Sequence, residues 1–161
     1  MGSGKTHWGK IWAATYKLGF IDLDEEIESV ELKSVTDLFE AKGEDYFRTV
    51  EAKTLRNLGQ LSNTIISCGG GTPCFADNMQ WMNENGITVY LTATPEEILR
   101  RLLKGQQQQQ RPLINKVNPA ELLFFIEKKL KEREAFYQQA NIILPSVDLT
   151  TDTFAEKILT Y

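Results

Sequence analysis

The sequence predicts an α/β protein in which helices cover a parallel sheet. Short apolar, β-branched segments alternate with longer segments of helical periodicity, and this alternation is typical of βαβ units. Hydrophobic residues make up 42% of the 161 residues and charged residues 25%, which is usual for a globular domain. The length suits a single domain spanning residues 1–161, and the sequence shows neither an internal repeat nor a linker.

Strands and helices can be assigned from apolar runs and from the residues that begin and end them. The expected strands are residues 20–22, 63–68, 87–91 and 141–144. The expected helices are residues 5–18, 24–30, 35–43, 44–58, 76–86, 95–103, 119–138 and 152–160. Gly19, Gly43 and Gly86 are expected stop signals. Ser34, Thr94-Pro95 and Asn118-Pro119 are expected N-terminal signals.

Composition argues against several classes of partner. The net charge is −4 and the pI is about 5.1, which disfavours nucleic acid or an anionic membrane surface as the main partner. No apolar run approaches the ~18 residues of a membrane span. Cys68 and Cys74 match no zinc pattern, and a reduced cytoplasmic setting explains them more simply than a disulfide.

The first residues form half of a phosphate-binding loop, "GSGKT". Gly2, Ser3 and Gly4 allow backbone N–H groups to turn inward around phosphate oxygens. Lys5 can reach the β- and γ-phosphates of a nucleotide, and the Thr6 hydroxyl can bind Mg²⁺ at the start of a helix. The alternative is a flexible glycine-rich terminus. The motif continues directly into a predicted helix, and this favours the phosphate-binding loop over that alternative.

The other half of this motif, and the strand that normally precedes it, do not occur in the sequence. The complete pattern requires a glycine five positions before Gly4, and that position lies before Met1. We expect Met1 to be an internal methionine and the start to lie about ten residues upstream. Without the strand, three buried apolar side chains would be lost at a cost of roughly 5–9 kcal/mol, and two strand edges would be exposed.

Two carboxylates follow the first apolar strand in "FIDLDEE". Asp22 and Asp24 are two positions apart, so they share a face if the segment is extended. Ligands of open α/β sheets bind at the carboxyl ends of the strands. One carboxylate could hold Mg²⁺ through water, and the other could orient a hydroxyl group and accept its proton. The alternative is an acidic helix N-terminus over residues 24–26.

Glycines and arginines later in the chain suit an anionic substrate. Gly69, Gly70 and Gly71 would let a ligand approach the backbone closely, or would form a plain turn. Arg48 and Arg133 lie on separate predicted helices. Each alone would be an ordinary surface arginine, but two converging guanidinium groups would bind a carboxylate. Arg111 follows a glutamine run and could reach transferring phosphate from a closing lid.

Together these motifs resemble the shikimate kinase family. The matching segments occur in order over nearly the whole chain. They are "GSGKT", "FIDLDEEIE", "LFEAKGEDYFRTVEA", "SCGGG", "VYLTATPEEILRRL", "RPLI" and "EREAFYQQA". Each motif is weak alone, whereas their order and spacing are specific.

The resemblance implies an α/β P-loop kinase of the nucleoside-monophosphate-kinase type. It implies a substrate-binding segment at about 24–60, a lid at about 104–118, and a missing first central strand. The implied reaction transfers the γ-phosphate of ATP, with Mg²⁺, to the 3-hydroxyl of shikimate in a cytoplasmic monomer. By position, the resemblance assigns a catalytic role to Asp24, Lys5 and Arg111. It assigns Gly2, Ser3, Gly4, Lys5, Thr6 and Arg111 to ATP binding, and Thr6 and Asp22 to Mg²⁺. It assigns Asp24, Arg48, Gly70, Gly71 and Arg133 to shikimate binding.

Two other interpretations remain open at this point. One is a different small-molecule P-loop kinase, such as a gluconate kinase, against which the two arginines argue because they predict a carboxylate on the substrate. The other is an inactive truncated form, which the missing strand favours. The run Gln106–Gln110 also lengthens the lid beyond the usual family length.

Overall fold

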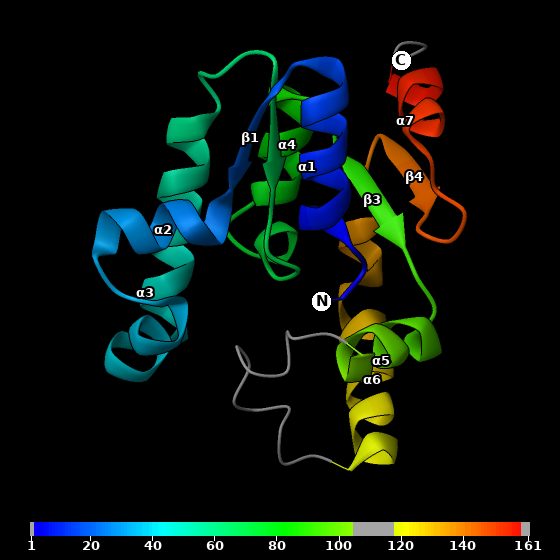
Figure 1. Cartoon of the computed structure of the whole chain (residues 1–161). Helices are drawn as coiled ribbons and strands as arrows, with labels where there is room; N and C mark the ends of the chain where they lie inside the picture. The colour runs from blue at the N-terminus through cyan, green and yellow to red at the C-terminus, as the bar shows by residue number, and fades with distance from the viewer. Residues whose placement is uncertain (1, 105–117, 159–161) are drawn as a thin grey trace.

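The computed structural model describes residues 2–104 and 118–158, in which parallel strands alternate with helices as predicted (Figure 1). The strands are β1 (Gly19–Asp22), β2 (Thr64–Ser67), β3 (Val89–Thr92) and β4 (Ile142–Pro145). The helices are α1 (Lys5–Tyr16), α2 (Leu23–Glu31), α3 (Val35–Leu58), the short 3₁₀ turn η1 (Thr72–Cys74), α4 (Asn78–Asn85), α5 (Pro95–Lys104), α6 (Pro119–Tyr137) and α7 (Thr151–Ile158).

Most predicted helix ends are confirmed, and one is wrong. α3 combines the two predicted helices, with Gly43 as a non-helical break at φ 80°. The predicted stop at Gly19 is wrong because α1 ends earlier, with Lys17 in the left-handed conformation at φ 55°. Gly19 instead begins β1, where a Cβ atom would lie 2.8 Å from Thr64 Oγ1. This glycine therefore allows β1 and β2 to approach each other.

The strands form two parallel pairs rather than one continuous sheet. β1 pairs with β2, with Phe20 beside Ile65, and β3 pairs with β4, with Tyr90 beside Ile143. Within the described part of the chain, β2 and β3 each pair along one edge only. A largely apolar cavity of about 970 Å³ is lined by residues that include parts of β2 and β3.

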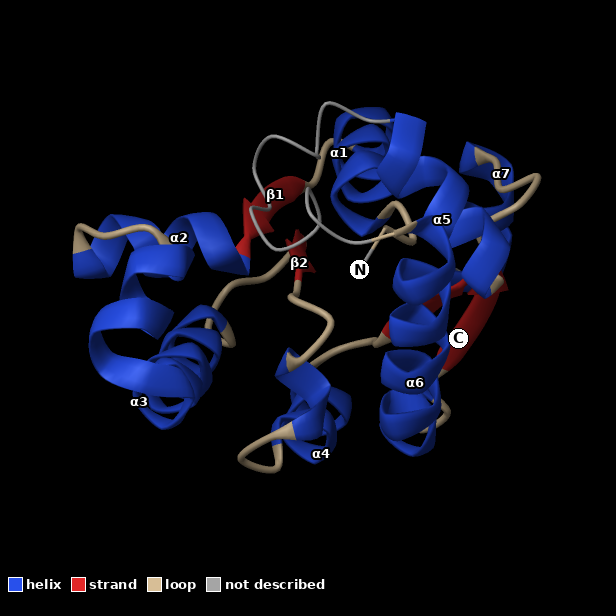
Figure 2. Cartoon of the chain, turned by 90° about the horizontal axis from the view of Figure 1, so that it is seen from below, coloured by secondary structure: helices blue, strands red, loops and turns tan. Residues whose placement is uncertain are grey.

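Three apolar clusters hold the helices in place. Trp12 of α1 stacks on Phe154 of α7 at 4.3 Å between ring centroids, beside β3 and β4. A second cluster surrounds the fully buried Leu23 and Leu38 where α2 packs on α3, and a third joins α5 to α6. In the view from below, α2 and α3 lie on one side of β1 and β2, and α5 and α6 lie on the other (Figure 2). None of the helices in residues 2–104 and 118–158 has the length and hydrophobicity to cross a bilayer.

Candidate active site

The phosphate-binding loop runs directly into α1. Gly2 and Gly4 have φ angles of 67° and 92°, in the left-handed region that favours glycine. Arg101 of α5 donates hydrogen bonds from Nη1 to the carbonyl oxygens of Ser3, at 3.0 Å, and Gly2, at 3.4 Å. Because these carbonyls are bound to a cation, the groups that the loop can offer to a phosphate are its N–H donors and the N-terminus of α1. The sequence analysis did not assign Arg101.

Three oxygen atoms from three elements meet where this loop approaches the first strand pair. The Thr6 hydroxyl donates a hydrogen bond to Asp22 Oδ2 at 2.9 Å and lies 3.1 Å from Ser67 Oγ. Hydroxyl and carboxylate oxygens are the ligands that Mg²⁺ prefers, so this cluster fits a magnesium ion. The sequence analysis did not assign a role to Ser67. This residue lies directly opposite Asp22 in the pairing of β1 with β2.

The second carboxylate lies in a helix rather than in the strand. Asp22 caps α2 by accepting a hydrogen bond from the Asp24 backbone N–H at 3.1 Å, so the two residues do not form one extended segment. The alternative of an acidic helix N-terminus over residues 24–26 describes the local structure. Asp24 nevertheless faces the glycine loop, residues 69–71. A Cβ atom on Gly69 would lie only 3.3 Å from Asp24 Oδ1. A side chain at position 69 would therefore press against the Asp24 carboxylate.

Arg48 is held against the other end of the glycine loop. Its Nη1 donates to Glu51 Oε2 at 2.7 Å, and Glu51 is 1% exposed. The second oxygen of Glu51 accepts a hydrogen bond from Thr72 Oγ1 at 2.6 Å. A Cβ atom on Gly71 would lie 2.6 Å from Arg48 Nη2. Glu51 thus fixes both the arginine and η1. The analysis of the sequence missed Glu51, although its i+3 spacing from Arg48 was a usable signal.

Two cysteines beside the glycine loop are affected by the cations of the site. Burial raises the pKa of Cys74 in η1, and the positive charges of Arg133 and Arg48 oppose this rise. Burial raises the pKa of Cys68 to about 12, and Lys5 opposes the rise. Lys5, the predicted phosphate-binding lysine, lines the large cavity together with Ser67 and Cys68 at the end of β2. Both cysteines are free thiols.

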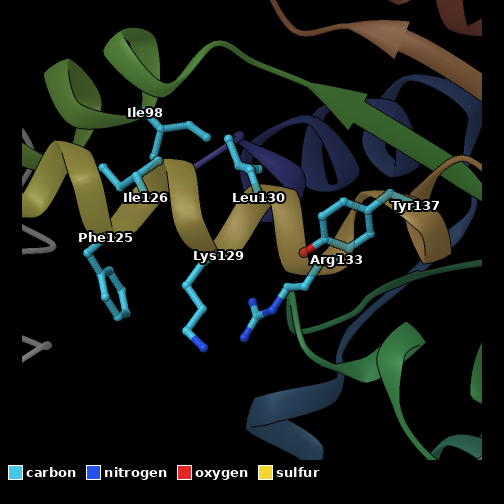
Figure 3. A pocket seen from close by; sticks show the side chains of 7 residues that line it. All are labelled: Ile98, Phe125, Ile126, Lys129, Leu130, Arg133 and Tyr137. Carbon is cyan, nitrogen blue, oxygen red and sulfur yellow. The ribbon is translucent and has the colours of Figure 1, made fainter.

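Arg133 lies on the face of α6 that lines a smaller cavity of about 110 Å³. Lys129 and Arg133 project from the same face of this helix, and the Tyr137 hydroxyl lies beside Arg133 (Figure 3). Arg111 and nearly all of the predicted lid lie outside the described residues. The structure therefore gathers the predicted residues of the phosphate loop, both aspartates, both glycine-loop residues and two of the three arginines at one end of β1 and β2.

The sequence and the structure were compared with those of known proteins to identify the family of this chain. The model of the shikimate kinase family matches residues 1–161. This chain belongs to the shikimate kinase family. The shikimate kinase of Azobacteroides pseudotrichonymphae is 42% identical over 160 residues, which cover 99% of this chain and 93% of that protein. The shikimate kinase of Bacteroides fragilis is 44% identical over 143 residues, covering 89% and 79%.

Solved shikimate kinase structures share the fold. The crystal structure of shikimate kinase from Bacteroides thetaiotaomicron superposes with a TM-score of 0.93 and 38% identity, covering 100% of this chain and 94% of that one. Shikimate kinase from Acinetobacter baumannii, solved in complex with shikimate, has a TM-score of 0.82 and 32% identity, covering 99% and 87%. The α/β P-loop kinase fold predicted from the sequence is therefore correct.

Proposed function

We propose that this protein is an ATP-dependent kinase that transfers the γ-phosphate of ATP to the 3-hydroxyl of shikimate. The products are ADP and shikimate 3-phosphate. Family membership over the whole chain supports the reaction. The observation that carries the proposal is the hydrogen bond between Thr6 and Asp22 at 2.9 Å. This contact joins the phosphate loop to the segment that bears Asp24, so donor and acceptor can meet at one place.

On the nucleotide side, the chain supplies positive charge and oxygen ligands. The N–H groups of the loop and the Lys5 ammonium would hold the β- and γ-phosphates. Thr6 and Asp22 would hold Mg²⁺, which neutralises charge on the phosphates when it is bound. Arg111 is proposed to approach the transferring phosphate from the lid. These groups position the phosphate, and phosphoryl transfer depends mainly on position and charge neutralisation.

On the acceptor side, Asp24 would accept a hydrogen bond from the reacting hydroxyl of shikimate. This orients an oxygen lone pair toward the phosphorus atom, and the carboxylate takes the proton late because an alcohol has a high pKa. Arg48 and Arg133 would bind the carboxylate of shikimate, with the backbone of Gly70 and Gly71 beside them. Guanidinium groups suit this task because their fork matches a carboxylate.

We further propose that the enzyme works as a monomer in the cytoplasm. The free thiols Cys68 and Cys74 suit a reducing compartment. Sedimentation at several protein concentrations tests the monomer, and a mass that rises with concentration would contradict it.

The reaction is tested by measuring ADP release with ATP, Mg²⁺ and one acceptor at a time. Shikimate should support turnover, whereas gluconate and nucleoside monophosphates should not. Asp24→Asn should lower kcat by at least about 100-fold, because removal of a general base typically costs 10²–10⁴-fold, while ATP binding measured by calorimetry persists. Turnover with gluconate but not with shikimate would refute the proposal.

The assignment of Arg133 is tested separately. Arg133→Ala should raise KM for shikimate by about 10- to 100-fold, because a hydrogen bond to a charged group contributes roughly 1.5–3 kcal/mol. KM for ATP should change less than about twofold. Lys129→Ala, one turn earlier on the same face of α6 (Figure 3), is the matched control. Equal rises in both KM values would count against a role in binding the acceptor.

A further inference from the structure

The glycine loop, residues 69–71, has a backbone carbonyl that is bound from a distant element. The Gly69 carbonyl accepts from the Thr72 N–H at 3.1 Å, and the Gly71 carbonyl accepts from the Cys74 N–H at 2.9 Å. The Gly70 carbonyl accepts instead from the Tyr137 hydroxyl of α6 at 2.6 Å, across 67 positions of the chain. All three carbonyls are therefore occupied, and the polar groups that the loop can offer to an anion are its N–H donors.

We propose that Tyr137 is a positioning residue that sets the affinity of the site for the acceptor's carboxylate. It does so by fixing the direction of the Gly71 N–H and by holding the loop at a set distance from Arg133. This inference rests on the proposed function, because it concerns how the same site binds shikimate. It adds a residue that the sequence motifs did not assign to any role.

The geometry of the peptide bond links the Tyr137 contact to the opposite side of the loop. A trans peptide is planar, so its C=O and N–H groups point in opposite directions. When the Gly70 carbonyl is bound to Tyr137, the Gly71 N–H must point away from α6. Glycine has unusually free backbone dihedrals, so three consecutive glycines would otherwise sample many orientations of these amides. One hydrogen bond from a fixed side chain removes much of that freedom.

The Tyr137 side chain is itself well fixed. Its ring packs against the ring of Tyr90 of β3 at 4.8 Å between centroids, a contact that does not require the Tyr90 hydroxyl. Burial raises the pKa of Tyr137, although Arg133 opposes the rise, so the hydroxyl remains protonated and can donate at neutral pH. Arg133 and Tyr137 are one helical turn apart and line the same cavity (Figure 3).

The test is Tyr137→Phe, which removes the hydroxyl and keeps the ring. KM for shikimate should rise about tenfold, because the substrate must then order the glycine loop when it binds. KM for ATP should stay within about twofold. Tyr90→Phe removes the neighbouring hydroxyl, which binds Glu134 rather than the loop. Tyr16→Phe removes a hydroxyl that binds the Thr151 carbonyl at 2.9 Å in a different part of the molecule. Neither control should change KM for shikimate.

A measurement without substrate separates this inference from the proposed function. Backbone amide exchange at Gly70 and Gly71, followed by NMR, should be faster in Tyr137→Phe than in the wild type or in Tyr90→Phe. Unchanged exchange, or equal rises in KM for shikimate and ATP, would overturn the positioning role. If the wild type fails to phosphorylate shikimate, the proposed function fails instead, and the exchange data still decide whether Tyr137 orders the loop.

Discussion

Glu51 shows how a single buried charge can organise an active site. Its two oxygens bind Arg48 at 2.7 Å and Thr72 at 2.6 Å, and the side chain is 1% exposed. A buried ion pair gains little over an apolar alternative, but removing one partner leaves an uncompensated charge. Glu44 binds the same arginine at 3.1 Å from an exposed position. The contributions of a buried and an exposed carboxylate to stability can therefore be compared on one arginine.

Glu51→Gln should therefore destabilise the protein strongly. We expect a loss of roughly 3 kcal/mol, because the amide N–H₂ group faces the guanidinium N–H donors without a charge to compensate them. For a domain of this size, this corresponds to a fall in Tm of roughly 6–12 °C, measured by calorimetry. Glu44→Gln should cost less than about 1 kcal/mol, as exposed pairs do. Similar losses in the two variants would contradict the importance of burial.

The two thiols should differ in reactivity. Thiol alkylation requires the thiolate, and burial raises the pKa of Cys68 to about 12. The pKa of Cys74 is also raised, but Arg133 and Arg48 oppose the rise. Iodoacetamide at about pH 8.5 should therefore modify Cys74 first. Cys68→Ser and Cys74→Ser leave one thiol each, and mass spectrometry over time gives the two rates. Faster modification of Cys68 would contradict the burial of its thiol.

At the scale of elements, the sequence predicted the starts of helices correctly, because these depend on residues that are close together in the chain. Thr94 and Asn118 begin α5 and α6 as expected, because each side chain accepts a hydrogen bond from a nearby backbone N–H. Contacts between distant segments could not be predicted in this way. The bond from Tyr137 to Gly70 and the bond from Thr72 to Glu51 depend on how α3, α6 and η1 pack together. Neither bond leaves a local pattern in the sequence that specifies its partner.

Ser34 offers a test of one such local signal. The Asp37 N–H donates to Ser34 Oγ at 3.1 Å, and the Ser34 hydroxyl donates to Asp37 Oδ2 at 2.7 Å. Ser34→Ala should cost about 1 kcal/mol and lower Tm by roughly 2–4 °C. KM for shikimate should not change, because the break at Gly43 separates this cap from Arg48. Thr36→Ala, at an exposed position in the same turn, is the control and should leave Tm nearly unchanged. A raised KM in Ser34→Ala would mean that the break does not isolate the two parts of α3.

At the scale of the molecule, the proposed site draws on elements that follow both pairs of strands. The proposed substrate-binding residues cluster around β1 and β2, whereas α5, which binds the phosphate loop through Arg101, follows β3. The cavity of about 970 Å³ lies between these halves and is lined by Ile65 and Ile66 on one side and by Val89 and Leu91 on the other. Among the described residues, no backbone hydrogen bond joins β2 to β3.

Filling this cavity should stabilise the protein. We expect that five apolar residues such as Val and Ile, fused ahead of residue 1 through a short glycine turn, will lie between β2 and β3 and pair with both. Burial of three large side chains contributes roughly 5–9 kcal/mol, and ordering the added backbone opposes this at about 1–2 kcal/mol per residue. These two terms nearly cancel for five residues, so the hydrogen bonds formed with β2 and β3, at roughly 0.5–1.5 kcal/mol each, decide the result. A net gain of roughly 2 kcal/mol would raise Tm by about 4–8 °C.

Thermal unfolding and amide exchange together test this expectation. The inner-edge amides of β2 and β3 should become protected when the added segment pairs with them, and kcat should rise because the phosphate loop and the acceptor site are then joined by one sheet. An extension of equal length with proline and aspartate in place of the apolar residues is the control, because proline cannot donate to a strand and a buried carboxylate is unfavourable. If both extensions gave the same Tm and the same exchange pattern, the cavity would not accept a strand. The two halves of the molecule would then have to be held together by helix packing alone.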